Sequence, residues 1–131
     1  RSYTNAVGIE ERSLASTDVS ALGRAVAYIE DHPDRSISLR ELAGAAGLSP
    51  FHFSRVFKRH FGQTPSRYVE RRRIEGAKPL IVGAQMPLAA VAQAVGFADQ
   101  SHFTRRFRAH EGCTPAQFAR EHAKGILPSG K

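Results

Sequence analysis

A repeat of about fifty residues restricts the fold of this 131-residue chain more than any other feature. The segment GLSPFHFSRVFKRHFGQTP, residues 47–65, is matched by GFADQSHFTRRFRAHEGCTP, residues 96–115. Identities before the turn are offset by 49 residues and those after it by 50, so one residue is inserted around Ala98. The identical pairs are Leu39 and Leu88, Ala43 and Ala92, Gly47 and Gly96, His52 and His102, Phe53 and Phe103, Arg55 and Arg105, Phe57 and Phe107, His60 and His110, Gly62 and Gly112, Thr64 and Thr114, and Pro65 and Pro115. We therefore expect two units with one structure and one role.

Each copy of the repeat has the pattern of a helix, a tight turn and a second helix. In the first copy an apolar stripe ends at Gly47, a residue type that tolerates the left-handed conformation of a helix end. Ser49 followed by Pro50 is typical of an N-cap and a first helical turn. The second copy repeats this order, with Gly96 as the break and Asp99 as the expected cap. The two apolar stripes are Leu39, Leu42, Ala43 and Ala46, and Leu88, Val91, Ala92 and Val95.

Two further helices are predicted around the repeat, and no segment alternates as a β-strand does. An opening helix is expected over about residues 18–32, and a longer helix over about residues 65–82 joins the two copies. The buried side of the opening helix should hold Leu22, Val26 and Ile29. The second helix of each copy is expected to end at Gly62 and Gly112, with Thr64-Pro65 and Thr114-Pro115 starting the next helix. Residues 1–16 and 124–131 lack periodicity and are expected to be tails or linker remnants. The predicted fold is all-α.

Positive charge is concentrated in one part of the sequence. Residues 1–49 contain five Lys and Arg against seven Asp and Glu, whereas residues 50–131 contain fourteen against five, for a net charge of +7. All eight phenylalanines lie between Phe51 and Phe118. A basic region that also holds the aromatic core favours a folded surface that contacts a polyanion, although a merely soluble protein could have the same balance.

The composition also excludes several classes of protein. Cys113 is the only cysteine, so an internal disulfide and a cysteine-rich zinc site are excluded, and a reducing compartment is favoured. No apolar run approaches the ~20 residues needed to span a bilayer, and no secretory signal is recognisable. The chain begins without methionine, and we expect it to be a piece of a longer protein. A soluble cytoplasmic protein is expected.

The second helix of each copy has one apolar and one polar face at about 100° per residue. The predicted inward residues are Phe53, Val56, Phe57 and His60, and Phe103, Phe107 and His110. A helical hairpin with a short glycine turn can place its second helix in a DNA major groove, although many helical hairpins do not bind DNA. Arginine can bind guanine through two hydrogen bonds, glutamine can pair with adenine, and phenylalanine can pack on a thymine methyl group. The predicted base-contacting residues are Phe51, Ser54, Arg55, Gln100, Ser101, Thr104 and Arg105, and the predicted phosphate-contacting residues are Lys58, Arg59 and Arg108.

Other polar groups have simpler interpretations. The run Arg71-Arg72-Arg73 on the joining helix is as well explained by a solvated or salt-bridged face as by phosphate contact. The histidines recur with the repeat, which favours packing or helix-end roles over metal binding. No His and Asp arrangement accompanies the single cysteine, so no catalytic residue is predicted. We expect no metal, no cofactor and no enzymatic activity.

The stretch GFADQSHFTRRFRAHEGCTPAQFA, with the preceding LAAVAQAV and the degenerate first copy, resembles the signature of the AraC/XylS family of bacterial transcription regulators. The resemblance covers about residues 18–122 and implies seven helices, with two helix–turn–helix subdomains bridged by one long helix. It implies base contacts at positions matched by Phe51, Ser54 and Arg55, and by Gln100, Ser101 and Arg105. It also implies double-stranded promoter DNA and RNA polymerase as partners. A small-molecule effector would act through a domain that precedes this one.

The resemblance sets expected boundaries, with an AraC-type DNA-binding domain at 17–123. Its parts are a first subdomain at 17–63, a linker helix at 64–83 and a second subdomain at 84–123. The linker departs from the family pattern at Gly76 and Pro79, because Pro79 removes a hydrogen bond to the carbonyl of Glu75 and is expected to bend or shorten the helix. An unbroken 18-residue helix would span about 27 Å, against ~34 Å between successive major grooves on one face of DNA.

The sequence therefore predicts sequence-specific binding of double-stranded DNA by a cytoplasmic, nucleoid-associated bacterial transcription regulator. Two recognition helices would enter successive major grooves, and the membrane would not be a partner. One alternative is a targeting module of a DNA-repair or DNA-modifying protein, whose reactive group would lie elsewhere. Another is a nonspecific nucleic-acid-binding protein, which would bind random duplexes or single strands as tightly as any selected site.

Overall fold

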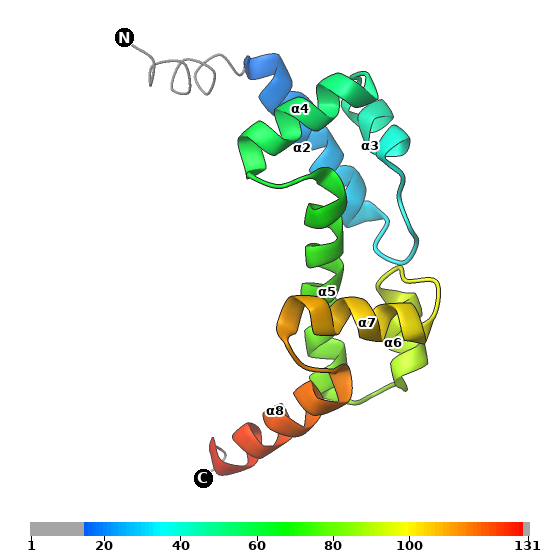
Figure 1. Ribbon diagram of the computed structural model, residues 1–131, viewed down its shortest axis with the longest axis vertical. Helices are drawn as coiled ribbons and strands as arrows, with labels where there is room; N and C mark the ends of the chain where they lie inside the picture. The colour runs from blue at the N-terminus through cyan, green and yellow to red at the C-terminus, as the bar shows by residue number, and fades with distance from the viewer. Residues whose placement is uncertain (1–14, 130–131) are drawn as a thin grey trace. The chain divides into compact units, whose positions relative to one another are not determined.

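The computed structural model describes residues 15–129, with side chains to residue 123, and folds this range into seven α-helices without a strand (Figure 1). The helices are α2 (Ser16–Asp31), α3 (Leu39–Ala46), α4 (Pro50–Phe61), α5 (Pro65–Gly83), α6 (Leu88–Ala94), α7 (Gln100–Glu111) and α8 (Pro115–Ser129). The all-α prediction and its helix count are confirmed. Helix α3 with α4, and α6 with α7, are the two helix–turn–helix pairs that the repeat predicts.

The chain forms two compact units that share the helix α5. Unit 1 contains α2, α3, α4 and α5 up to Val69, and unit 2 contains the loop Pro33–Ser36, α5 from Glu70, and α6 to α8. The boundary between the two units therefore falls inside the helix expected at 64–83, after Val69. The physical reason is that Tyr68 and Val69 pack on the core of unit 1, whereas the later apolar residues of α5 belong to the core of unit 2.

The core of unit 1 lies where α2 packs against α3 and α4. Its centre is Phe57, which is fully buried, with ring centroids of Phe53, Phe61 and Tyr68 at 5.4, 4.4 and 5.2 Å. The core residues from these helices are Ala21, Leu22, Ala25, Ile29, Leu42, Ala43, Ala46, Phe53, Val56 and Phe57. Val26, expected in this core, is half-buried, and Leu39 is exposed because it stands at the first position of α3.

The core of unit 2 repeats this arrangement around Phe107, with α5 supplying the third helix. The ring of Phe107 lies 5.7 Å from that of Phe103 and 5.4 Å from that of Phe118 of α8. The core residues are Ile74, Ala77, Ile81, Val91, Ala92, Val95, Phe97, Phe103 and Phe107. The paired phenylalanines of the repeat are thus core anchors in both units, as their i, i+4 spacing predicts.

The tight turns of the two units are built alike. Gly47 and Gly96 have φ angles of +76° and +90°, in the left-handed region that favours glycine. In each unit the amide that follows the glycine donates to a carbonyl five residues back, Leu48 to Ala43 and Phe97 to Ala92, both at 2.9 Å. These are the hydrogen bonds of a Schellman helix end. The residue inserted in the second copy, Ala98, is exposed and follows this turn without altering it.

The helix starts are capped at the predicted residues. The Ser49 hydroxyl accepts from the His52 amide at 3.2 Å, and the Asp99 carboxylate accepts from the His102 amide at 2.8 Å. Helices α4 and α7 end at Gly62 and Gly112, with φ of +77° and +81°. The hydroxyls of Thr64 and Thr114 then accept from amides in the first turns of α5 and α8, at 3.2 and 3.1 Å. Local rules thus fix both ends of α4 and of α7.

Pro79 was expected to bend or shorten helix α5, and of these two effects shortening is wrong, because the helix continues past Pro79 to Gly83. Proline inside a helix costs about 3 kcal/mol, but Pro79 and the Glu75 residue whose carbonyl loses its partner are both exposed. Water can therefore hydrogen-bond that carbonyl. Ala77 and Ile81 on either side are buried in the core of unit 2, and their packing offsets the lost hydrogen bond.

The ends of the chain also differ from expectation. Helix α8 runs to Ser129, so most of the tail predicted at 124–131 is helical. Once a helix is nucleated, each further residue adds a hydrogen bond, and α8 can continue without an apolar stripe. At the other end, α2 begins at Ser16, while residues 1–14 of the expected tail lie outside the described residues.

Candidate nucleic-acid interface

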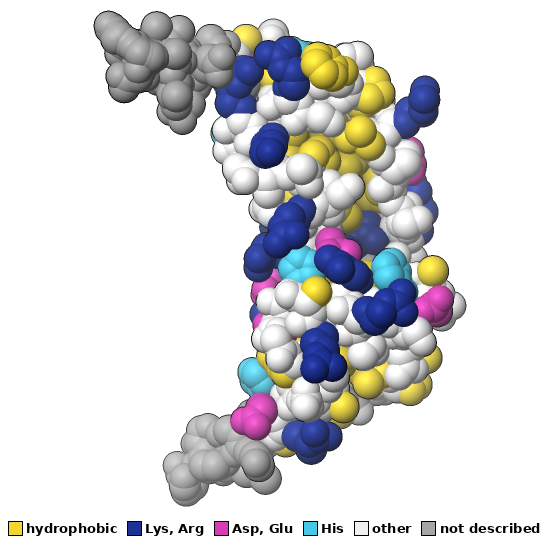
Figure 2. All heavy atoms as spheres, in the orientation of Figure 1, with side chains coloured by type: hydrophobic (Ala, Val, Ile, Leu, Met, Phe, Trp, Pro, Cys, Tyr) yellow, Lys and Arg dark blue, Asp and Glu magenta, His cyan; other side chains and the backbone are white. Residues whose placement is uncertain are grey.

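The outward face of α4 carries every residue that we predicted for it. Arg55 and Lys58 are exposed, Ser54 and Arg59 are half-buried, and Phe51 is 74% exposed. These five residues line one shallow depression of about 600 Å³, together with Leu39 and the start of α5. Figure 2 shows dark blue Lys and Arg side chains beside yellow apolar groups over this helix. Unit 1 thus has a concave surface that is lined by apolar side chains, hydroxyls and cations.

The outward face of α7 has a depression at the matching positions. It is lined by Gln100, Ser101, Thr104 and Arg105, and its volume is also about 600 Å³. Three of the four are exposed, and Thr104 is half-buried. The structure therefore brings together all the predicted base-contacting residues of this unit. Arg108, predicted for phosphates, is exposed one turn further along α7. Figure 2 shows dark blue side chains over α7, whose basic residues of this colour are all arginines.

The matched histidines of the repeat lie in different environments. His60 is exposed, so its predicted inward placement is wrong, whereas the His110 side chain is only 2% exposed. The difference comes from α5, because the Glu70 carboxylate lies 2.8 Å from His110 Nε2. An ionised carboxylate can only accept, so Nε2 carries the hydrogen. In unit 1 the ring of His60 packs on the edge of Phe61 instead, with centroids 4.7 Å apart.

Glu70 also binds Arg106, a residue that was predicted for neither face of its helix. Its two carboxylate oxygens accept from Arg106 Nε at 2.9 Å and from Nη2 at 2.8 Å. Burial alone would raise the pKa of Glu70, but the hydrogen bonds from Arg106 and His110 outweigh it and lower the pKa. The matching residue of unit 1 is Val56, which is buried. Arg106 is therefore a charged residue at a core position of the repeat, and this pattern indicates a partner of opposite charge elsewhere in the chain.

Arg73 is the one charged residue among the described ones that is buried, at 6% exposure. Its Nη1 donates to the carbonyls of Arg35, at 2.7 Å, and Val95, at 3.2 Å. Burial lowers its pKa. Because Arg73 is buried, neither a solvated face nor phosphate contact describes it, whereas the salt-bridged face that was also expected for the arginine run stays a prediction. A signal was available, because Arg73 precedes Ala77 by four residues and so shares its apolar stripe.

The guanidinium of Arg73 occupies the space beside Gly96. A Cβ atom added to Gly96 would collide with Nη1 of Arg73 and lie 3.1 Å from the Arg35 carbonyl oxygen. Glycine is therefore required at position 96 for two reasons, the positive φ angle and the close approach of the Arg73 guanidinium. The turn before α7 is thereby fixed to α5 and to the loop Pro33–Ser36 of the same unit.

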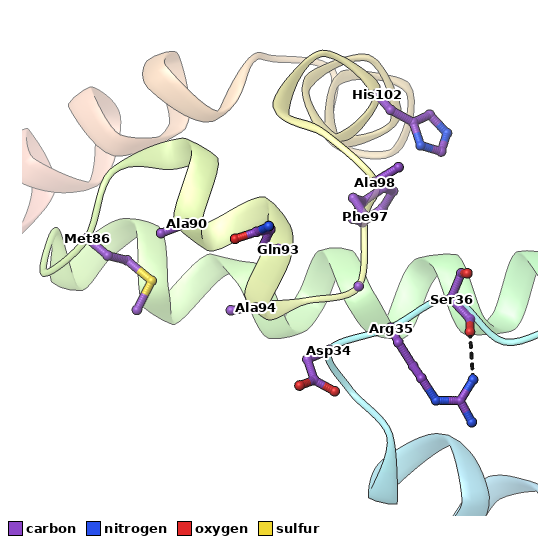
Figure 3. Close-up of a pocket in the computed structure, with 11 residues that line it drawn as sticks. Asp34, Arg35, Ser36, Met86, Ala90, Gln93, Ala94, Phe97, Ala98 and His102 are labelled. Atoms are coloured by element: carbon purple, nitrogen blue, oxygen red, sulfur yellow. Dashed lines mark hydrogen bonds between the residues drawn. The ribbon is translucent and has the colours of Figure 1, made fainter.

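A second depression of unit 2, of about 720 Å³, lies beside α6 (Figure 3). Small apolar groups of α6 and the following turn form its floor, and Asp34, Arg35, Gln93 and His102 supply polar groups around it. The Arg35 guanidinium donates to the neighbouring Ser36 carbonyl at 3.1 Å. Acidic and basic side chains stand side by side here, and none of the predicted base-contacting residues lines it. This depression therefore does not extend the cationic surfaces of α4 and α7.

Within residues 15–123, whose side chains the structure describes, no group of three or more His, Cys, Asp or Glu is arranged to hold a metal ion. Across the described helices, none has the length and apolar character required to cross a bilayer.

The chain is similar to known helix-turn-helix proteins in sequence and in fold. The family model described as a helix-turn-helix domain matches residues 42–121. The probable transcriptional regulator LumQ of Photobacterium leiognathi is 46% identical over 76 residues, which are 58% of this chain and 31% of LumQ. The HTH-type transcriptional activator Btr of Bacillus subtilis is 37% identical over 112 residues, which are 86% of this chain and 21% of Btr.

A solved structure of similar fold comes from Chromobacterium violaceum and is described as a transcriptional regulator of the AraC-type DNA-binding domain-containing proteins. It has a TM-score of 0.73 and 26% identity, covering 83% of this chain and 97% of that one. The chain belongs to the AraC/XylS-type helix-turn-helix family of transcriptional regulators. These relatives are named as regulators and not as enzymes. The chain spans about a fifth to a third of the length of the curated relatives that it matches.

Proposed function

We propose that this chain binds double-stranded DNA with sequence specificity, as the DNA-binding part of a bacterial transcription regulator. The observation that carries the proposal is the pair of matched depressions on α4 and α7. Each depression lies on the outward face of a capped helix, opposite the face that carries its fully buried phenylalanines. Each is lined by hydrogen-bond donors suited to base edges. The family to which the chain belongs supports the same role.

The proposed contacts follow from side-chain chemistry. Arg55 and Arg105 each offer two parallel hydrogen bonds to O6 and N7 of guanine, and Gln100 can pair with N6 and N7 of adenine. Hydroxyl groups at Ser54, Ser101 and Thr104 can donate to or accept from either base pair. The exposed cations Lys58 and Arg108, with the half-buried Arg59, would neutralise phosphates, which contributes affinity and salt dependence but no sequence preference.

Within this proposal each unit contacts its own major groove, and the two half-sites differ in sequence. Unit 1 presents Phe51 and Ser54 where unit 2 presents Ser101 and Thr104. The chain carries out no chemistry of its own. We further propose that the regulator acts on RNA polymerase at a promoter within the nucleoid, and that a small-molecule effector is sensed by a domain outside this chain.

Selection of duplexes from a random library tests the proposal. The chain should enrich a site of about two helical turns that contains two different half-sites in tandem. A footprint of this site should shrink or weaken in both Arg55→Ala and Arg105→Ala variants. Enrichment of no sequence, with equal affinity for random duplexes and single strands, would contradict specific binding. A footprint of one half-site that is indifferent to Arg55→Ala would limit DNA contact to unit 2.

A further inference from the structure

An aromatic ring stands exposed on the face of α4 that we propose enters the major groove. Phe51 is 74% exposed, whereas Phe53 and Phe57 of the same helix are fully buried. Burial of such a side chain favours folding, and Phe51 forgoes that gain. Leu39 of α3 is 41% exposed and lines the same depression. Two large apolar side chains are therefore available there to bind an apolar group of a partner.

The charge around this depression restricts what the partner can be. Arg55, Lys58 and Arg59 stand among its lining residues, and no carboxylate is included. A lining that combines apolar side chains and hydroxyls with cations, and that contains no carboxylate, suits a partner that displays an apolar group among negative charges. In the DNA major groove that group is the methyl at C5 of thymine, and phosphates flank it on both strands.

Phe51 and Arg55 form a contacting pair. The guanidinium carbon of Arg55 lies 5.7 Å from the ring centroid of Phe51, within the range of a cation–π interaction. The residues are four apart on α4, so their side chains leave the helix from the same face. This contact favours a position of the guanidinium over the ring before DNA is bound. Successive base pairs are only about 3.4 Å apart, so if Arg55 binds a guanine, Phe51 is within reach of a neighbouring base pair.

We infer that unit 1 recognises a C5 methyl group on a pyrimidine next to a guanine, through Phe51 and Arg55 together. This inference rests on the proposed function and adds a ligand class to it. Thymine supplies the methyl group in unmodified DNA. 5-Methylcytosine carries the same methyl group on the same ring atom, and cytosine lacks it. Unit 1 therefore distinguishes 5-methylcytosine from cytosine at this position of its half-site.

Unit 2 shows which residue the property requires. Ser101 takes the place of Phe51, so Arg105 has no ring four residues before it on α7. The variant Phe51→Ser gives unit 1 the side chain that unit 2 already has at this position. Because Phe51 is exposed, the substitution should leave the denaturation midpoint unchanged, and any change in DNA binding can be assigned to the interface.

The test uses the preferred duplex from the selection, with the half-site of unit 1 identified by its relaxed preference in Arg55→Ala. Each thymine next to a guanine in that half-site is replaced singly by deoxyuridine, which lacks only the methyl group, and Kd is measured at constant salt. For the wild-type chain we expect one replacement to weaken binding about fourfold, which corresponds to about 0.8 kcal/mol for one buried methyl-sized group. Phe51→Ser should bind the thymine and deoxyuridine duplexes equally.

A second pair of duplexes carries cytosine or 5-methylcytosine at the same position. The wild-type chain should bind the methylated duplex about fourfold more tightly, by the same area of contact, and Phe51→Ser should not distinguish the two. The inference is overturned if deoxyuridine is tolerated at every such position, or if Phe51→Ser retains the loss. Neither result would affect the proposed function, which fails only if no preferred duplex is selected.

Discussion

Removal of the Glu70 carboxylate is expected to destabilise unit 2 through two groups that it leaves without a partner. In Glu70→Ala the Arg106 guanidinium loses its bidentate acceptor, but its side chain is 37% exposed, so that loss is screened and costs about 0.5–1 kcal/mol. The His110 ring is only 2% exposed, and a buried donor left unsatisfied costs about 1–3 kcal/mol. The two losses together come to about 1.5–4 kcal/mol.

Urea denaturation followed by circular dichroism measures this loss, and α5 supplies a matched control. Glu75 is 51% exposed and pairs with Lys78 in the same helix, so Glu75→Ala should cost less than about 1 kcal/mol. The pH dependence gives a second check. The pKa of Glu70 lies below the usual 4.5 in the folded protein, so its contribution is complete above pH 4.5 and is lost as the pH falls through the lower value. The reasoning would be refuted if Glu70→Ala and Glu75→Ala lowered the free energy of unfolding equally. It would also be refuted if the loss caused by Glu70→Ala were as large in acid as at neutral pH.

Three further substitutions test the fold. Phe57→Ala and Phe107→Ala should each destabilise by about 3–5 kcal/mol, and small shifts in melting temperature for both would mean that these residues are not core anchors. Gly96→Ala should lower the free energy of unfolding more than Gly112→Ala does. At Gly112 the new Cβ meets no atom within 4 Å, so the only cost is the positive φ, about 1–2 kcal/mol. Equal losses of stability in denaturant would contradict the packing described at Gly96. Pro79→Ala should raise the free energy of unfolding by up to about 3 kcal/mol, and the melting temperature with it. The same substitution should change the affinity for DNA whose half-sites have the native spacing. A less stable variant would show that proline favours this helix.

The parts of the fold that follow from local rules could be predicted from the sequence. The turn glycines, the Ser49 and Asp99 caps and the paired phenylalanines each depend on residues within five positions along the chain. Because the repeat supplies every such pattern twice, a chance match in one copy is excluded by the other. The outward faces of α4 and α7 followed from the inward ones by helical periodicity.

The parts that depend on distant partners could not be predicted. Arg73 finds its two acceptors 38 and 22 residues away along the chain, and Glu70 binds Arg106 across 36 residues. His60 and His110 occupy the same position of the repeat, yet only His110 has a carboxylate of α5 beside it. Periodicity assigns a residue to a face of its own helix, but it does not say which helix packs there or what charge that helix supplies.

The base preference of matched arginine variants tests the central claim most directly. Selection from random duplexes is performed with the wild type, Arg105→Ala and Arg108→Ala, two neighbouring exposed arginines of α7. Arg105→Ala should lose preference at one base position and weaken the preferred site by about 1–3 kcal/mol. Arg108→Ala should keep every preference, weaken all duplexes alike and reduce the slope of log K against log salt by about 1. An unchanged preference in Arg105→Ala would contradict the assignment of the α7 depression to base recognition.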